Sequence, residues 1–463
     1  MRNFSEEYLR ITLDASLSVL EQYKWLTDSY VLDFFVENHW ERIPASWQNT
    51  FTSGHFHVKD MALLLNQDGD FCRKFSCVLP LSILTLKYLI QRLSISRKQE
   101  KIGNLHFPGL IGHPKFRNLF AKNVKIKKRH EIERMSAICS ETAERCGVEY
   151  LVDVGGGLGH LSRVLAFGHG KKVCCVERQD SLNIQARVLD DQFLRFAKKY
   201  LQSEEYEALH SPTHLNLSIS ADLDAKSFVK HLKAEVFGVT DKGDFTLGIV
   251  GLHPCGDLGP ILLNMFRECS EVKFIAVVGC CYMKLTGDGY PLSEHLRKVK
   301  VKRPERVILS YEAREVACHA MEMYEERLSQ GLYDDLKIHA YRSALERIIV
   351  KKWPDLKHTG LKSVKYRDCS SFREYCRKAV AKLQLILPEA GPEEIKDCME
   401  WEKVAIFYTF RLMLAPLVES VILTDRMLFL RENLPRTVTS SCDTVAVFDP
   451  RLSPRNHIVI ATK

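Results

Sequence analysis

The stretch Leu151-Val-Asp-Val-Gly-Gly-Gly-Leu-Gly-His-Leu-Ser162 determines how the rest of the chain is interpreted. Its first four residues are typical of a short buried strand, and the glycine run lets the backbone turn sharply before a helix begins near His160. Such a turn brings backbone N–H groups and the positive end of the helix above the carboxyl end of the strand. Open α/β sheets bind ligands at that edge, so the pattern predicts a nucleotide-like ligand.

Two common phosphate-binding motifs do not fit these glycines. A dinucleotide fingerprint that starts at Gly155 needs a third glycine where this chain has His160, and the Lys-Ser or Lys-Thr pair of a phosphate loop is missing. The next strand, 172–176, is followed by Glu177, and an acid about 20 residues after a glycine loop suits a ribose diol. This spacing resembles the S-adenosylmethionine site of class I methyltransferases, whose first acid serves the methionine end and whose second acid serves the ribose.

We therefore predict that S-adenosylmethionine is the cofactor. After a third strand, 214–219, Asp222 would accept a hydrogen bond from an adenine amino group, or alternatively cap the following helix. The basic run 122–130 precedes the first sheet strand and would lie near the cofactor edge, or be a solvated face. The predicted cofactor-binding residues are Asp153, Gly155, Gly156, Gly157, Gly159, Glu177, Asp222 and His130.

Length and composition exclude several classes of protein. The 463 residues are too many for one compact core, and 46% hydrophobic with 27% charged residues is typical of a globular protein. The N-terminus has acids where a signal peptide has a basic and then an apolar region, so we expect an intracellular protein, cytoplasmic or nuclear, with reduced cysteines. The apolar stretch 404–430 is interrupted by Arg411, Glu419 and Asp425, so we expect a partly buried helix and no membrane insertion.

Strands that alternate with helices predict a parallel sheet covered on both faces. Two more apolar strands, 245–252 and 272–279, follow the first three, and the chain closes with an antiparallel pair of apolar strands. A class I methyltransferase sheet has such a pair after its fifth strand, so we predict an α/β Rossmann-like sheet of that class. The predicted divisions are a helical N-terminal domain (1–121), a methyltransferase core (122–290), a helical insertion (291–440) and a final strand pair that completes the core sheet (441–463).

Nucleophilic and titratable side chains follow the fourth and fifth strands. Because the carboxyl ends of parallel strands meet at one edge of a sheet, we expect them to line the acceptor pocket of a methyl transfer, where positioning and exclusion of water matter most. His253 is the candidate general base, since imidazoles titrate near neutral pH, and Asp257 would orient it or bind the acceptor. The predicted catalytic residues are His253, Cys255, Asp257, Cys280, Cys281, Tyr282 and Lys284.

The same thiols have two other interpretations. They are buried and inert, as cysteines in loops often are, or they bind zinc. Adjacent cysteines ligate one metal awkwardly and no CxxC pair is present at this site, so we predict no metal. The zinc ligands of that alternative would be His253, Cys255, Cys280 and Cys281, with Cys318 and His319 as further candidates.

Two motifs, Gly251-Leu-His-Pro-Cys-Gly-Asp-Leu258 and Val278-Gly-Cys-Cys-Tyr-Met-Lys-Leu285, strongly resemble the methyltransferase-like protein 25 and 25B group, formerly called rRNA adenine dimethylase domain-containing. The resemblance implies a class I S-adenosylmethionine-dependent methyltransferase and covers most of the chain. Further similarity lies at Ala317-Cys-His-Ala320, Leu414-Ala-Pro-Leu-Val-Glu419 and Leu452-Ser-Pro-Arg-Asn456.

The group's older name suggests adenine, but the motif after the fourth strand does not. Adenine N6 methyltransferases typically carry Asn-Pro-Pro-Tyr there, whereas this chain has His253-Pro-Cys-Gly256. The tRNA 2′-O-methyltransferases with a His-x-Cys-Gly motif and a following Cys-Cys are more similar, which favours RNA and a hydroxyl acceptor. The basic runs 122–130 and 297–303 are candidate RNA contacts. The alternatives are a ribosomal or translation protein as acceptor, and a non-catalytic binding module.

Overall fold

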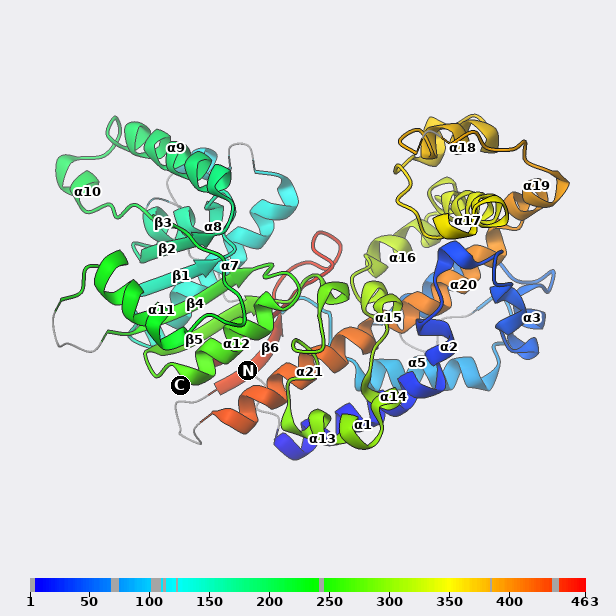
Figure 1. Cartoon of the computed structure of the whole chain (residues 1–463), viewed down its shortest axis with the longest axis horizontal. Coiled ribbons are helices and arrows are strands. Elements are labelled where there is room, and N and C mark those ends of the chain that lie inside the picture. Colours follow the sequence, from blue (N-terminus) through cyan, green and yellow to red (C-terminus); the bar gives the residue numbers. More distant parts are fainter. Residues whose placement is uncertain are drawn as a thin grey trace. The chain divides into compact units, whose positions relative to one another are not determined.

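The computed structural model describes residues 5–67, 75–100, 110, 114–121, 124–240, 245–383, 385–434 and 441–463 (Figure 1). The chain forms two compact units. The sheet unit comprises residues 1–14, 96–308 and 421–463, and the helical unit comprises residues 15–95 and 309–420.

A seven-stranded sheet with the order β3-β2-β1-β4-β5-β7-β6 is the centre of the sheet unit. The first five strands are parallel, and β7 runs antiparallel between β5 and β6. This confirms the predicted Rossmann-like α/β sheet closed by an antiparallel pair. The strands are β1 (Tyr150–Val154), β2 (Lys172–Glu177), β3 (Thr213–Asn216), β4 (Leu247–Leu252), β5 (Val272–Val278), β6 (Ser441–Ala446) and β7 (His457–Thr462).

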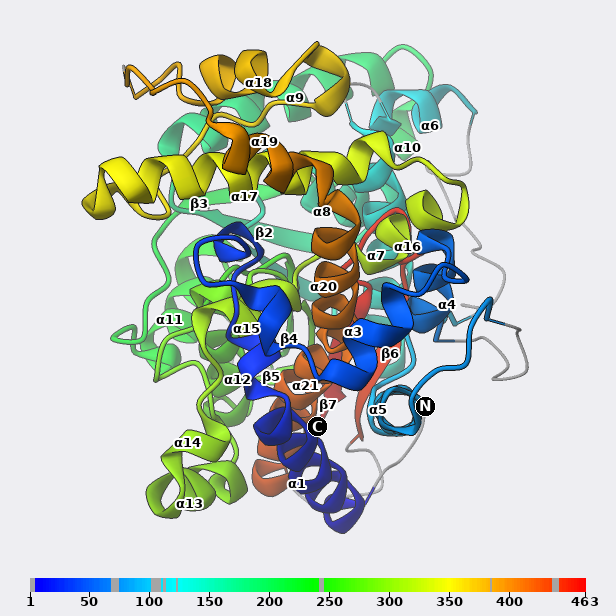
Figure 2. The ribbon, with the colours of Figure 1, turned by 90° about the vertical axis from the view of Figure 1, so that its right-hand side faces the viewer.

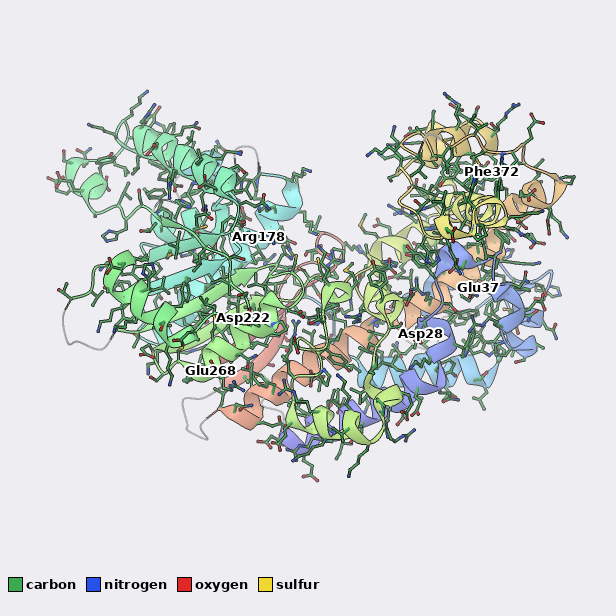
Figure 3. The ribbon with its side chains drawn as sticks, viewed as in Figure 1. Asp28, Glu37, Arg178, Asp222, Glu268 and Phe372 are labelled. Carbon is green, nitrogen blue, oxygen red and sulfur yellow. The ribbon has the colours of Figure 1, made fainter. Side chains whose placement is uncertain are left out.

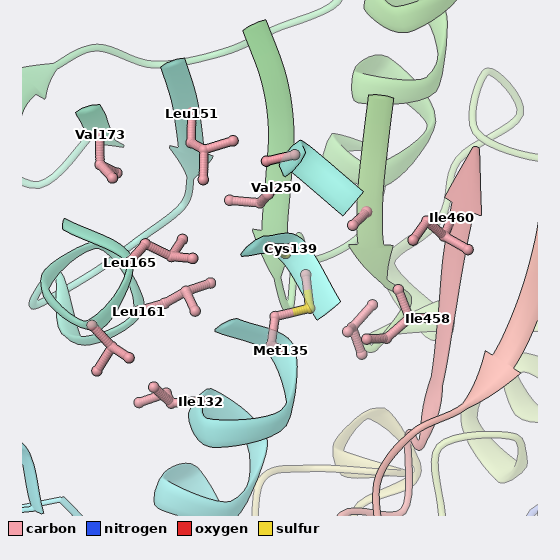
Figure 4. Close-up of a cluster of buried hydrophobic side chains, with 14 of the residues drawn as sticks. Ile132, Met135, Cys139, Leu151, Leu161, Leu165, Val173, Val250, Ile458 and Ile460 are labelled. Carbon is pink, nitrogen blue, oxygen red and sulfur yellow. The ribbon is translucent and has the colours of Figure 1, made fainter. Parts of the chain in front are cut away.

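Helices cover the sheet, and their apolar faces form its core. Met135 and Cys139 of α7 are buried against β1, β4 and β7, as Figure 4 shows. The helix α7 begins at Ile126, inside the basic run, because long basic side chains are good helix formers. The helices of this unit are α6 (Pro114–Ala121), α7 (Ile126–Arg145), α8 (His160–Arg163), α9 (Asp180–Ala197), α10 (Ser203–Glu207), α11 (Ala225–His231), α12 (Leu258–Glu268), α13 (Glu294–Lys302) and α14 (Pro304–Val307).

The helical unit joins two segments that are distant in the sequence. Its helices pack through aromatic side chains, such as Trp47 against Phe410 at 4.7 Å between ring centroids, and α17 lies across α20 (Figure 2). Its helices are α2 (Lys24–Thr27), α3 (Ala45–Phe51), α4 (Met61–Leu65), α5 (Leu81–Leu93), α15 (Tyr311–Val316), α16 (Met321–Ser329), α17 (Asp334–Lys352), α18 (Phe372–Ala379), α19 (Pro392–Met399) and α20 (Trp401–Met413), while α1 (Glu6–Gln22) and α21 (Ala415–Asn433) each have residues in both units.

The division into units differs from the predicted one. Residues 15–95 are not a separate N-terminal domain, because their apolar faces are buried against residues 309–420 of the expected insertion. Residues 291–308 and 421–440 of that insertion belong to the sheet unit. A hydrogen bond joins the two segments of the helical unit, since the Asn66 amide donates to Glu325 Oε1 at 3.0 Å.

The stretch 401–433 is long and apolar enough to cross a membrane, but its most apolar window is entirely buried in the protein. The three charges that interrupt it are buried too, more deeply than expected. Asp425 accepts hydrogen bonds from the Ser293 backbone and hydroxyl at 2.9 and 2.6 Å, and Arg411 donates to the Glu312 carbonyl at 2.8 Å. These partners offset the cost of burying charge, so the stretch is accommodated as core helices.

Candidate functional site

The glycine loop after β1 needs its glycines for two different reasons. Gly155, Gly157 and Gly159 have φ angles of +73°, +59° and +66°, which side chains disfavour. Gly156 has no room, because a Cβ there would lie 2.4 Å from the Sγ atom of Cys175. The loop is therefore a tight turn that presents backbone rather than side chains at the carboxyl end of β1.

Asp153 lies beneath this loop and is only 1% exposed. Its Oδ2 atom accepts a 2.6 Å hydrogen bond from the Ser162 hydroxyl in the first turns of α8. Burial raises the pKa of Asp153 to about 6, although the Ser162 hydrogen bond opposes the shift. The carboxylate thus ties the loop to the helix that follows it.

We expect Asp153→Asn to remove a pH-dependent loss of stability. The pKa of Asp153 is about 6 in the folded protein and about 3.9 in an unfolded chain. The contribution of the Asp153 side chain to the free energy of unfolding is therefore fully present below about pH 4. It falls by about 1–3 kcal/mol as the pH rises through 6. Between about pH 4 and pH 7, the free energy of unfolding of Asp153→Asn should rise relative to that of the native chain.

Urea unfolding across that range measures the difference, with the exposed Asp222→Asn as the control variant. The amide retains an acceptor for the Ser162 hydroxyl, so the fold should be preserved. Parallel pH profiles for Asp153→Asn and the native chain would contradict the assignment of this carboxyl as the titrating group.

Glu177 ends β2 beside the loop. Its two carboxylate oxygens accept hydrogen bonds from the N–H groups of Gly157 at 3.1 Å and Gln179 at 3.0 Å. A carboxylate has about four acceptor positions, so two remain for hydroxyl groups of a ligand. The register Val154↔Val176 places Glu177 level with Gly155, the first residue of the loop. This arrangement fits a ribose diol held at the ends of β1 and β2.

Two other predicted cofactor residues have different environments. Asp222 is exposed in the turn after β3 (Figure 3), and the helix cap considered for it is made by Asp224, which accepts from the Lys226 N–H at 3.1 Å. The Nε2 atom of His130, on α7, accepts a 2.9 Å hydrogen bond from the Asp449 N–H. Burial and the neighbouring Arg134 lower the pKa of His130, which suits this neutral acceptor.

A buried ionic cluster that sequence reasoning missed supports the loop. Asp190 of α9 receives 2.6 Å contacts from Arg163 Nε and from His214 Nε2. Arg163 also donates to the Leu158 carbonyl within the loop at 3.2 Å. A Cβ on Gly159 would lie 2.9 Å from the His214 ring, so the cluster explains that glycine. Three polar residues on separate elements give no spacing signal in the sequence.

His253 follows β4 in a left-handed conformation, with φ of +73°. Its Nε2 atom lies 3.1 Å from Oε2 of Glu131, a residue of α7 that is 2% exposed. The other Glu131 oxygen accepts a 2.6 Å hydrogen bond from the Ser453 hydroxyl. Burial alone would raise the pKa of Glu131, but the hydrogen bond with His253 and the Ser453 contact outweigh it and lower the pKa.

The contact with Glu131 shows that Glu131, rather than Asp257, orients His253. The Asp257 carboxylate instead accepts from the Thr286 N–H at 2.9 Å and the Thr286 hydroxyl at 2.7 Å. Sequence reasoning missed Glu131 because an acid at the end of a basic run looks like part of a solvated helix face. Nothing in the spacing pairs it with a residue that follows β4.

The loops after β4 and β5 bring three predicted thiols together. Cys255 Sγ lies 3.2 Å from Cys280 Sγ and 3.4 Å from Cys281 Sγ, and the latter two are 3.7 Å apart. Cys255 is exposed, whereas Cys280 is buried. The hydrogen bond from the Cys280 thiol, against the effect of burial, lowers the pKa of Cys255 to about 5.

The remaining predicted residues are arranged around these loops. Tyr282 is 1% exposed, and the buried Arg426 guanidinium lies 5.8 Å from its ring centroid, so Tyr282 packs within the fold. The Lys284 side chain is exposed, while its carbonyl approaches Gly256. In the helical unit, His319 contacts Glu315 at 2.5 Å and Tyr408 at 2.9 Å, which occupies both ring nitrogens.

Comparison with known proteins identifies the domain around this site. Residues 127–288 match a family model described as a methyltransferase domain. The chain is 32% identical over 234 residues to probable methyltransferase-like protein 25 from Mus musculus, covering 46% of this chain and 37% of the mouse protein. It is also 32% identical over 233 residues to the Homo sapiens protein of that name, covering 46% and 36%. The match spans little more than a third of the length of these relatives.

Proposed function

We propose that the chain is a member of the methyltransferase-like protein 25 family and that it transfers the methyl group of S-adenosylmethionine to an RNA hydroxyl. The glycine loop carries this proposal. Asp153 supports the loop from below, and Glu177 borders it with two acceptor positions that suit a ribose diol. The loop and both acids lie at the carboxyl ends of β1 and β2, where open α/β sheets bind ligands.

The bound cofactor would supply an activated methyl group on a sulfonium. The protein's own contribution is to position the acceptor and exclude water, and to remove a proton where the acceptor is a hydroxyl. His253 is suited to that step because Glu131 holds its Nε2 atom at 3.1 Å, and Nδ1 has no partner among the described residues. Nδ1 would then take the hydroxyl proton, and the buried Glu131 carboxylate would stabilise the imidazolium.

The choice of RNA rests on charge and on the motif after β4. His253-Pro-Cys-Gly256 lacks the amide side chain with which adenine methyltransferases hold a base. Lys125, Lys128 and Arg129 are exposed around the start of α7, and Lys302 and Arg303 are exposed at the end of α13, so both basic runs can contact phosphates. Lys122 and Asn123 of the first run lie outside the described residues.

Transfer of label to cellular RNA tests the proposal. The purified chain is incubated with methyl-labelled S-adenosylmethionine and total cell extract, and the product is divided between nuclease and protease. Nuclease-sensitive label that is lost in Glu177→Gln supports RNA methylation. Protease-sensitive label would instead identify a protein acceptor, and calorimetric binding of S-adenosylmethionine without any label would favour a non-catalytic module. Glu177→Gln suits this test because the amide keeps the size of the side chain and one acceptor oxygen.

A further inference from the structure

The Cys255, Cys280 and Cys281 sulfurs form a triangle that suits one metal ion better than three separate thiols. A tetrahedral zinc ion with Zn–S bonds near 2.3 Å holds its sulfurs about 3.8 Å apart. The observed separations are 3.7 Å, close to that value, and 3.4 and 3.2 Å, somewhat shorter, and all three are far from the roughly 2.05 Å of a disulfide. The contact between the neighbours Cys280 and Cys281 also removes the objection that adjacent cysteines cannot face one ion.

The two loops that carry the thiols are fixed by contacts that do not involve sulfur. Asp257 binds the backbone and the side chain of Thr286, which joins the loop after β4 to the loop after β5. Gly256 has φ of +59°, and a Cβ there would lie 2.9 Å from the Lys284 carbonyl. The close approach of the backbones therefore sets the position of Cys255, so the thiols are preorganised for a shared ligand.

A buried cation beneath the cluster would balance the charge of a metal-thiolate site. Arg426 is 3% exposed, and its Nη1 atom would lie 2.8 Å from a Cβ on Gly279, the residue before Cys280. Its Nε atom is buried without a hydrogen-bond partner in the described structure, and Cys280 is among the groups that interact electrostatically with this guanidinium. Three thiolates and one Zn²⁺ carry a net charge of −1, which Arg426 would compensate.

We propose that Cys255, Cys280 and Cys281 bind one zinc ion through their three sulfurs and leave a fourth coordination position open. Soft thiolate ligands favour zinc among the common divalent ions, and the exposed Cys255 makes the cluster accessible from solvent. Three protein ligands with an open position are typical of catalytic rather than structural zinc. The open position lies at the ends of β4 and β5, and it would accept an oxygen or sulfur ligand there. Zinc binding itself does not depend on the proposed methyl transfer.

Metal analysis of the full chain tests this inference. The chain is purified under reducing conditions, incubated with zinc and desalted, and the zinc is counted by plasma mass spectrometry. We expect about one equivalent in the native chain and below about a fifth of an equivalent in Cys255→Ser and in Cys281→Ser. The matched control is Cys369→Ser, a partly exposed thiol of the helical unit, which should retain the native amount.

Cobalt(II) loading gives a second readout that does not depend on the total metal count. A thiolate-to-cobalt charge-transfer band in the near ultraviolet should be present in the native chain and in Cys369→Ser, and absent in Cys255→Ser. Cys255 is exposed, so its serine variant should keep the native circular dichroism spectrum. Less than about a tenth of an equivalent of zinc in the native chain, or undiminished zinc in folded Cys255→Ser, would overturn the inference. Calorimetry with S-adenosylmethionine on the same samples separates this result from failure of the proposed function.

Discussion

His253→Ala should slow methyl transfer to RNA by about 10²–10⁴-fold, the usual contribution of a general base, and leave the affinity for S-adenosylmethionine within about two-fold. The affinity should persist because His253 follows β4, whereas the glycine loop and Glu177 follow β1 and β2. Initial rates with total cell RNA measure the first quantity and calorimetry measures the second. The control is His231→Ala, an exposed histidine at the end of α11.

The Glu131 contact provides a sharper test of the same pair. Glu131→Gln keeps an acceptor beside His253 but removes the buried negative charge, so the rate should fall by less than in His253→Ala. If Glu131 acts only through His253, the double variant should be no slower than His253→Ala alone. Additive losses would show that Glu131 has a separate role. A loss of less than about three-fold in His253→Ala would exclude it as the base.

Glu177→Gln should weaken S-adenosylmethionine binding by about 10- to 100-fold. A hydrogen bond to a charged group contributes about 1.5–3 kcal/mol, and 1.4 kcal/mol is a factor of ten in affinity. The amide can accept through one atom only, so it retains one of the present contacts to Gly157 and Gln179 but loses acceptor capacity for a diol. Calorimetric titration with S-adenosylmethionine measures the dissociation constant.

Glu149→Gln is the matched control for Glu177. Glu149 lies at the opposite end of the sheet, where it pairs with Lys172 at 2.9 Å, so its loss should not change cofactor affinity. Equal affinities of the native chain, Glu149→Gln and Glu177→Gln would refute the assignment of Glu177 to the ribose. A decrease in both variants would indicate that the sheet, rather than the site, was disturbed.

The sequence predicted features that depend on local pattern. The glycine loop, the ends of the strands and the closing antiparallel pair follow from short runs of residue types, and they led to Glu177 and to the three thiols. The same pattern could not show which way a side chain points. Asp153 is followed by the expected glycines, yet its carboxylate accepts a hydrogen bond from the Ser162 hydroxyl beneath the loop. Its direction depends on the packing of α8.

Long-range pairing was beyond prediction for a related reason. Glu131 and His253 meet because α7 packs on the sheet, and neither residue carries a signal for the other. The N-terminal helices were recognisable as helices, but an apolar helix face does not specify which distant helices cover it. We therefore expected residues 15–95 and residues 309–420 to lie in two separate domains, whereas the structure places them in one unit.

The position of β7 has a consequence for the synthesis of the chain. Its partner β5 ends at Val278, and β7 begins at His457, so roughly 180 residues emerge between the two. At about 5–20 residues per second, the hydrogen-bonding edge of β5 remains without its partner for roughly 10–40 seconds. An apolar edge strand without a partner favours aggregation. The nascent chain should therefore depend on chaperones until the residues between β5 and β7 have been synthesised and β7 pairs with β5.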